Sequence, residues 1–258
     1  MRIGGSIIIL MLLIGVLFYF LNNVVVHAQY PADAVQSNPL SISWTYPTHS
    51  LGETFTVYVD VVNVVDLFAF QCGFRFNPTV LQVVSVTVGG FLGPPGDIII
   101  IGPEPPWDNQ NGIVYALGAV RTDPSRAVSG TGHLLIVEMR INPALWPPYS
   151  GTYPGSSVSM IDLTDANGDP CELILYYKDG TSEVTPLPGH IYDGSFSLSV
   201  VWGDINYDGI VDVLDASQVG LHWTQTVPPA PIEVDINRDG IIDIQDAAII
   251  GLNWQKHG

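Results

Sequence analysis

A twelve-residue pattern that occurs twice near the end of the sequence constrains the fold more than any other feature. The copies span residues 204–215 and 235–246. In both, positions 1, 3, 5, 9 and 12 carry a side-chain oxygen, position 6 is glycine, and position 7 is an isoleucine that offers its backbone carbonyl. This is the ligand order of a calcium-binding loop, in which the glycine provides the sharp turn. The predicted ligands of two Ca²⁺ ions are Asp204, Asn206, Asp208, Ile210, Asp212 and Asp215 in the first copy, and Asp235, Asn237, Asp239, Ile241, Asp243 and Asp246 in the second.

The likeness between the two copies continues beyond the loops, where residues 216–223 align with residues 247–254. Alanine, valine or isoleucine, glycine and tryptophan recur there at i, i+3, i+4 and i+7, which is one face of a helix. Each copy therefore predicts a loop followed by a short helix. We expect Trp223 and Trp254 to pack between the two copies rather than to bind a ligand.

Neither loop leaves room for the preceding helix of an ordinary EF-hand. Residues 197–201 alternate like a strand, and residues 226–231 are rich in proline, which breaks helices. Position 12 is Asp instead of the usual longer Glu. A duplicated half-EF-hand of this kind resembles a dockerin, and the resemblance covers about residues 202–257. It implies a small calcium-dependent module that plugs into cohesin domains in extracellular assemblies such as cellulosomes.

The dockerin resemblance also implies which residues would contact a partner, because loop positions 10 and 11 dominate recognition in that family. These positions are Val213, Leu214, Ile244 and Gln245. Their largely aliphatic character suits the core of an interface, where a few anchors dominate affinity. The alternative is that these side chains are buried between the two copies.

The start of the chain indicates export. Arg2 precedes an apolar run over residues 7–21, and Ala28 completes a small-residue cleavage site before Gln29. This pattern predicts a secretory signal peptide over residues 1–28 and a secreted, extracellular or cell-surface protein. The alternative is an uncleaved anchor, although the run of about 15 residues is shorter than the roughly 20 that span a bilayer.

Between the signal peptide and the repeats, the chain predicts many short strands separated by Gly, Pro, Asn and Asp, with no long helical period. Candidate strands are residues 40–46, 54–61, 68–76, 81–88, 98–101, 113–117, 132–141, 156–163, 172–177 and 191–199. This spacing predicts a mainly β fold, a β-sandwich of sandwich or jelly-roll type. We expect a linker at 29–39, the sandwich at 40–200 and the α-helical module at 201–258.

Several phrases within the predicted sandwich resemble cohesin domains. They are the strand–turn–strand at 74–86, a glycine-rich strand entry at 130–139, and a closing hairpin and last strand at 165–170 and 192–196. Cohesin domains more commonly have Asp at the position of Asn77. The proline-rich stretch 93–110 has no clear counterpart in those domains. The resemblance implies a sandwich that receives a dockerin. Related sandwiches include carbohydrate-binding modules, so the fold alone does not decide the function.

The amino-acid composition limits the kinds of partner that the protein can bind. The formal net charge of −17 argues against binding to nucleic acid and to anionic membrane surfaces.

The two cysteines, Cys72 and Cys171, either form a disulfide, as is possible in an exported protein, or remain two buried free thiols. The sequence has no His-Glu-x-x-His, Gly-x-Ser-x-Gly or phosphate-loop motif, so we expect no enzyme.

Two functions therefore stay open. The first is a non-catalytic assembly protein that binds cohesin- or dockerin-bearing partners, with head-to-tail self-association between molecules as one form. The second is a carbohydrate-binding module that the dockerin attaches to a complex, with Trp107 stacking on a sugar ring of a polysaccharide. A row of exposed aromatic residues on one sheet face would favour the sugar, and an aliphatic and polar face would favour a protein.

Overall fold

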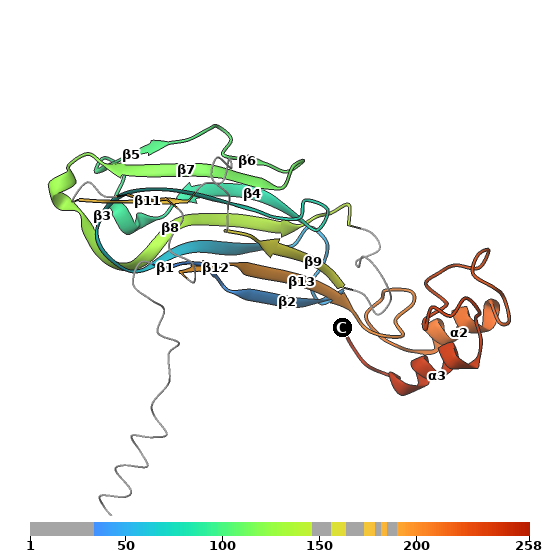
Figure 1. Ribbon diagram of the computed structural model, residues 1–258. Coiled ribbons are helices and arrows are strands. Elements are labelled where there is room, and N and C mark those ends of the chain that lie inside the picture. Colours follow the sequence, from blue (N-terminus) through green and yellow to red (C-terminus); the bar gives the residue numbers. More distant parts are fainter. Residues whose placement is uncertain (1–33, 146–155, 164–172, 179–181, 185–189) are drawn as a thin grey trace, which may run out of the picture. The chain divides into compact units, whose positions relative to one another are not determined.

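The computed structural model describes residues 34–145, 156–163, 173–178, 182–184 and 190–258 (Figure 1). The predicted signal peptide, the hairpin phrase at 165–170 and Cys171 lie outside the described residues.

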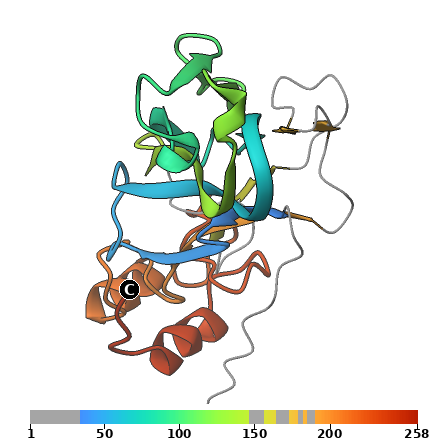
Figure 2. The same cartoon turned by 90° about the vertical axis from the view of Figure 1, so that its left-hand side faces the viewer.

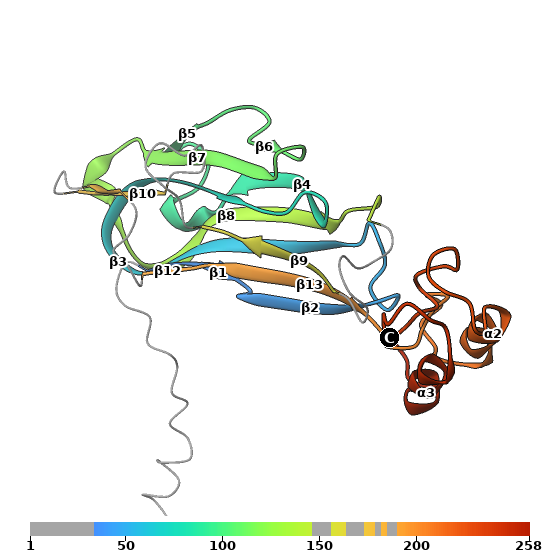
Figure 3. The same ribbon diagram turned by 45° about the vertical axis from the view of Figure 1, so that its right-hand side comes forward.

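The described strands form two sheets. In the larger, the order β11-β10-β3-β1-β12 is joined by β7 and β8 on β3, by β4 on β8, and by β5 and β6 on β7. The smaller has the order β2-β13-β9, which Figure 3 shows side by side. The strands are β1 (Ala34–Asn38), β2 (Ser41–Tyr46), β3 (Thr54–Arg75), β4 (Leu81–Val88), β5 (Ile98–Ile101), β6 (Trp107–Asp108), β7 (Ile113–Arg121), β8 (Val128–Ile141), β9 (Ser156–Ile161), β10 (Ile174–Tyr177), β11 (Ser182–Val184), β12 (Ile191–Tyr192) and β13 (Gly194–Val200). Short 3-10 helices η1 (Gly90–Leu92) and η2 (Pro124–Arg126) flank β5 and β7.

The larger sheet is built around one long strand, β3, which pairs with different neighbours along its two halves. Strand β3 pairs with β1 and β8 along its first half and with β7 and β10 along its second half. The sequence predicts two strands here, at 54–61 and 68–76, and that prediction is wrong. Asn63 and Asp66 lie between the two predicted strands and take positive φ angles of 55° and 57° at register shifts against β8. They act as bulges that bend the strand without ending it.

Side chains from both sheets meet in one buried cluster, so the predicted β-sandwich is confirmed (Figures 1 and 2). Phe55 of β3 and Phe196 of β13 stack with ring centroids 5.2 Å apart. Trp44 of β2 packs edge-on against both rings. These aromatic contacts join the larger sheet to the smaller one.

The predicted linker at 29–39 is wrong for its second half. Residues 34–38 form β1, which pairs antiparallel with β3 and parallel with β12. Ala34 and Val35 are fully buried in this strand. The segment is too short to show a periodic pattern, and its pairing with distant strands is invisible in the local sequence.

The repeats at the end of the chain form α2 (Val213–Leu221) and α3 (Ile244–Leu252). A second buried cluster, separate from that of the sandwich, surrounds Val211, Val219, Ile242 and Ile250. Among the described residues, no helix has both the length and the apolar character of a membrane span.

Candidate functional site

The two copies of the repeat fold into the same turn. In the first loop, the Asp204 carboxylate accepts a hydrogen bond from the Gly209 N–H at 2.9 Å. In the second loop, the Asp235 carboxylate accepts the matching bond from the Gly240 N–H, also at 2.9 Å. Both glycines have a φ of +91°, a conformation that residues with a side chain rarely adopt. The glycine predicted at position 6 is therefore required by the backbone of each loop.

The carboxylate at position 12 ties the start of each loop to its helix. Asp215 accepts from the Ile205 N–H at 2.7 Å, and its other oxygen accepts from the Asp212 N–H at 2.9 Å. Asp212, the N-cap of α2, accepts from the Leu214 N–H at 2.7 Å and, in return, from the Asp215 N–H. This reciprocal pair is a capping box, which satisfies amides at the first turn of the helix.

The second copy repeats the arrangement with the same distances. Asp246 accepts from the Ile236 N–H at 2.7 Å and from the Asp243 N–H at 2.9 Å, and Asp243 caps α3. The short Asp at position 12 thus serves the backbone of both the loop and the helix. The loop and the helix of each copy form one hydrogen-bonded unit.

The two copies interlock through position 8 of each loop. Val211 exchanges backbone hydrogen bonds with the segment after α3, accepting from Gln255 at 2.8 Å and donating to Lys256 at 3.1 Å. Ile242 makes the matching exchange with the segment after α2, accepting from Thr224 at 2.8 Å and donating to Gln225 at 2.9 Å. Each loop is therefore completed by the other copy.

The loops fit a calcium ion by their burial and by their mixed oxygen donors. The Asp235 Oδ1 atom is buried and has no hydrogen-bond partner among the described residues, a costly state for a carboxylate oxygen unless a cation lies beside it. Burial raises the pKa of Asp204 to about 6, and the nearby carboxylates Asp215 and Asp208 push it in the same direction. Burial also raises the pKa of Asp215.

The donor set suits a hard cation rather than a transition metal. No group of three or more His, Cys, Asp or Glu side chains is close enough to hold a metal ion in the part of the chain that the structure describes, so the calcium assignment rests on the loop pattern. The donors that the pattern predicts in each loop are carboxylate, amide and backbone carbonyl oxygens, which are the ligands of Ca²⁺.

The residues at loop positions 10 and 11 lie on the surface. Val213, Leu214 and Ile244 are 64%, 54% and 66% exposed, and Gln245 is also exposed. Their burial between the two copies, the alternative that the sequence left open, is therefore wrong. The inner faces of the helices are formed instead by side chains such as Val219, which is nearly fully buried.

The expectation that Trp223 and Trp254 pack between the copies is also wrong, because both are more than 40% exposed. Helix α2 ends at Leu221 and α3 ends at Leu252, so each tryptophan lies beyond the helix whose face it was expected to continue. The sequence pattern missed Leu221 and Leu252, which are 69% and 80% exposed. Together with the residues at positions 10 and 11, they give each copy an exposed apolar helix face.

The sandwich carries a groove that the sequence did not predict. A cavity of about 370 Å³ lies over β3, β5, β7 and β10. Its lining includes the small residues Ala69 and Gly118, with Ile101 of β5 and Tyr176 of β10. The strand register explains this arrangement, because Tyr176 lies opposite Ala69 on one side of β3 and Ile101 lies opposite Gly118 on β7. Apart from its aromatic residues, such as Tyr176, the lining is mostly aliphatic or small.

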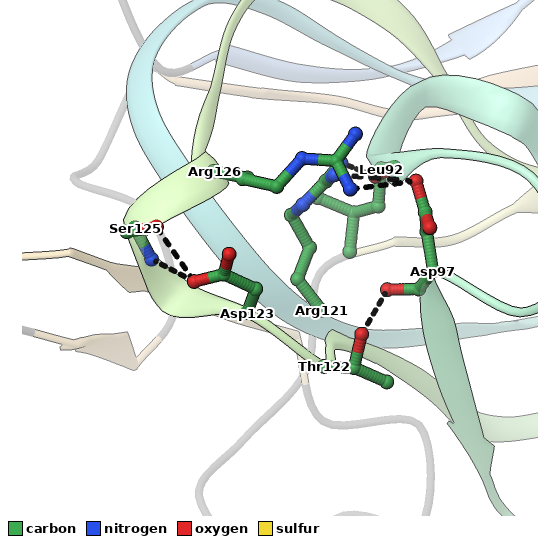
Figure 4. Close-up of polar contacts among 7 residues, drawn as sticks. All are labelled: Leu92, Asp97, Arg121, Thr122, Asp123, Ser125 and Arg126. Carbon is green, nitrogen blue, oxygen red and sulfur yellow. Dashed lines mark hydrogen bonds and ion pairs between the residues drawn. The ribbon is translucent and has the colours of Figure 1, made fainter.

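A buried arginine holds the start of β5 beside the end of β7 (Figure 4). The Arg121 guanidinium donates to the Leu92 carbonyl and lies 3.7 Å from the Asp97 carboxylate. The exposed Arg126 lies 3.3 Å from the same carboxylate, and the Thr122 hydroxyl donates to the Asp97 carbonyl at 3.2 Å. These contacts fix the strand that carries Ile101 into the groove.

Two further predicted sites can be placed. Trp107 in β6 is half-buried and packs against the sandwich core. The nearby Asn109 side chain bonds both backbone groups of Val83, at 2.7 and 2.9 Å. Trp107 therefore helps to hold its own loop against the sandwich, and its contact with a sugar stays a prediction. Cys72 is fully buried and has no disulfide partner among the described residues, and burial raises the pKa of its thiol. Because Cys171 lies outside the described residues, the disulfide stays a prediction.

Comparison with known proteins agrees with the dockerin resemblance. Residues 202–251 match the family model of the dockerin type I domain. No curated protein matches the chain. Similar solved structures include a non-cellulosomal cohesin from Archaeoglobus fulgidus, at 16% identity, a TM-score of 0.42, and coverage of 65% of this chain and 91% of that one.

Two other similar structures are a cohesin–dockerin complex and a cohesin domain. One is a type I cohesin–dockerin complex from Clostridium thermocellum, at 11% identity, a TM-score of 0.45, and coverage of 67% of this chain and 97% of that one. The other is a type II cohesin domain from the cellulosome of Acetivibrio cellulolyticus, at 15% identity, a TM-score of 0.44, and coverage of 64% and 95%. Because each TM-score is below 0.5, these likenesses carry no weight for function.

Proposed function

We propose that this chain, which carries a dockerin type I domain at residues 202–251, is an extracellular, non-catalytic adaptor. Its two loops bind calcium, and the calcium-loaded loops hold the helix faces that dock a cohesin-bearing partner. The predicted signal peptide supports the extracellular setting. The observation that carries the proposal is the pair of loops with the same turn, each of which has exposed residues at positions 10 and 11, three of the four aliphatic.

Calcium would act here by neutralising carboxylates that the fold brings together. Asp204 and Asp235 are almost fully buried, and like charges in a buried site repel one another. A cation removes this repulsion, so its binding free energy becomes folding free energy of the module. The loop then fixes the first turn of its helix through the capping box, which presents Val213 and Leu214, or their equivalents, to solvent.

Charge introduced on the helix faces tests the docking role. We expect Leu214→Asp combined with Gln245→Asp to abolish capture of the full chain by immobilised type I and type II cohesin domains, and to leave calcium affinity unchanged. The matched control is Thr224→Asp with Gln255→Asp, which adds the same charge at exposed, equivalent positions whose positive φ Asp tolerates. Loss of calcium binding together with capture would mean that Leu214 and Gln245 support the fold instead.

We further propose that the groove over β3, β5, β7 and β10 receives a protein, and that a dockerin-bearing partner is its occupant. Ile99, Ile100 and Ile101 are more than half exposed beside a floor of small residues. The aromatic residues among the described lining of the groove, Phe68, Phe70 and Tyr176, are buried or half-buried, so they do not form the flat exposed row on which sugars stack. An aliphatic surface gains affinity by burying apolar area against a protein anchor.

Two further variants test whether the sandwich binds a dockerin through the groove or a carbohydrate through Trp107. Ile99→Asp with Ile101→Asp should abolish binding of a dockerin panel, whereas Trp107→Ala should leave that binding unchanged. A pull-down with insoluble polysaccharides should give no capture of the wild-type chain. Retention on the polysaccharide that is lost in Trp107→Ala would instead support the carbohydrate-binding module.

A further inference from the structure

We infer that the sandwich braces the first calcium loop and leaves the second unbraced, so that the two sites bind calcium with unequal affinity. This inference rests on the proposed calcium binding, and it adds an order of binding and a role for the turn after β2.

Pro47, in that turn, touches the glycine at position 6 of the first loop. A Cβ atom placed on Gly209 would lie 2.7 Å from Pro47 Cδ and 2.8 Å from Pro47 Cγ. A Cβ atom placed on Gly240, the equivalent glycine of the second loop, would meet nothing within 4 Å. Because both glycines share a φ of +91°, the loops have the same turn and differ in what covers it.

A chain of hydrogen bonds reinforces this contact. The Thr48 hydroxyl donates to the Gly258 carbonyl, and the Gly258 N–H donates to the Gly209 carbonyl at 2.9 Å. The turn of the sandwich is thus connected to position 6 of the first loop by a second route, besides the Pro47 ring.

Apolar contacts also join the C-terminal module to the sandwich. Val200, the last residue of β13, belongs to the buried cluster of the C-terminal module, and Tyr46 of β2 packs against that cluster. Tyr46 also packs against the sandwich core. The first loop therefore lies against a sandwich edge that is itself held by the core.

Bracing changes affinity because it removes part of the ordering cost of binding. A loop that is already held in its bound turn loses less conformational freedom when the ion arrives. We expect the first loop to bind calcium about three- to tenfold more tightly than the second, and to fill first. By linkage, calcium in the first loop strengthens the contact between the module and the sandwich by the same factor.

The test uses the full chain in two single-site backgrounds. Asp235→Ala leaves the first loop, and Asp204→Ala leaves the second. In each background, Pro47→Ala with Thr48→Val is introduced, and calcium affinity is measured by isothermal titration calorimetry. We expect the dissociation constant to rise about three- to tenfold for the first loop and to change by less than about twofold for the second. An equal change in both loops, or none in either, overturns the inference. No heat of binding in either parent background would overturn the proposed calcium function itself.

A matched pair of glycine variants keeps the test open if the single-site chains do not fold. Gly209→Ala and Gly240→Ala introduce the same strain at the same φ, and only the first meets Pro47. We expect Gly209→Ala to lower the melting temperature in calcium more than Gly240→Ala. Adding Pro47→Ala should shrink that difference, as a double-mutant cycle. Equal losses for the two glycine variants contradict bracing.

Discussion

The buried carboxylates show why single residues decide the behaviour of the C-terminal module. Asp235 keeps one oxygen without a partner among the described residues, and Asp204 lies beside two other carboxylates. The sequence singles out these carboxylates as expected calcium ligands, because the ligand order of a calcium loop is local and fixed by spacing. The exposure of Trp223 and Trp254 could not be predicted, because it depends on where each helix ends.

Removal of one position-1 carboxylate should disable one site. We expect Asp204→Ala and Asp235→Ala each to reduce the calcium stoichiometry of the full chain from two to one. Calorimetry measures this, and Asn253→Ala, outside the loops, is a buried polar control. A stoichiometry of two in both variants would remove these residues from the ligand set.

Substitutions of one buried and one exposed aliphatic residue of α3 should separate an effect on stability from an effect on docking. Ile250→Ala removes a buried side chain and should cost about 2–5 kcal/mol of unfolding free energy. Leu252→Ala lies on the surface and should cost less than about 0.5 kcal/mol, yet weaken capture by cohesin domains. Denaturant titration in calcium and a capture assay check the two effects. If Leu252→Ala destabilised the chain as much as Ile250→Ala, its exposed position would be in error.

At the scale of elements, the sequence predicts strands well where their pattern is local and poorly where pairing is distant. The predicted strands at 81–88 and 98–101 coincide with β4 and β5. The groove was not predictable, because it joins β10 to β3 and β7, segments that lie far apart in the chain. The unbroken course of β3 was missed because the bulges resemble turn residues.

The contacts of Arg121, at the end of β7, predict that its substitution weakens the attachment of β5 to the sheet. Arg121→Met should cost about 1.5–3 kcal/mol, because it removes charge-assisted hydrogen bonds and leaves the Leu92 carbonyl without its donor. Arg126→Met is the exposed control and should be nearly neutral. Hydrogen exchange should show faster opening of β5 only in the Arg121 variant. Unchanged exchange there would mean that β7 alone holds the strand.

At the scale of the whole molecule, we expect the module not to reach the groove of its own sandwich. Strand β13 ends at Val200 and the first loop begins at Asp204, and a tether of about five residues spans at most about 17 Å. Any contact between a helix face and the groove should therefore join different molecules.

Light scattering over a concentration series should reveal which assembly forms. If the chain recognises itself, its mass should rise with concentration in calcium and fall to that of a monomer in chelator, as a head-to-tail contact requires. A constant mass would identify an adaptor between two other components. A monomer in which Leu252→Cys and Ile101→Cys are joined within one chain by a bifunctional thiol crosslinker would contradict the tether argument.

The position of β13 in the middle of the smaller sheet has a mechanical consequence. Strand β13 pairs along its length with β2 on one side and β9 on the other, and its end leads directly into the first loop. Tension transmitted from a bound partner along β13 would pull it lengthwise between its neighbours. The hydrogen bonds of both ladders would then share the force at once, in shear, rather than break one after another. The sandwich is thus built to carry load at the point where an anchored chain would be pulled.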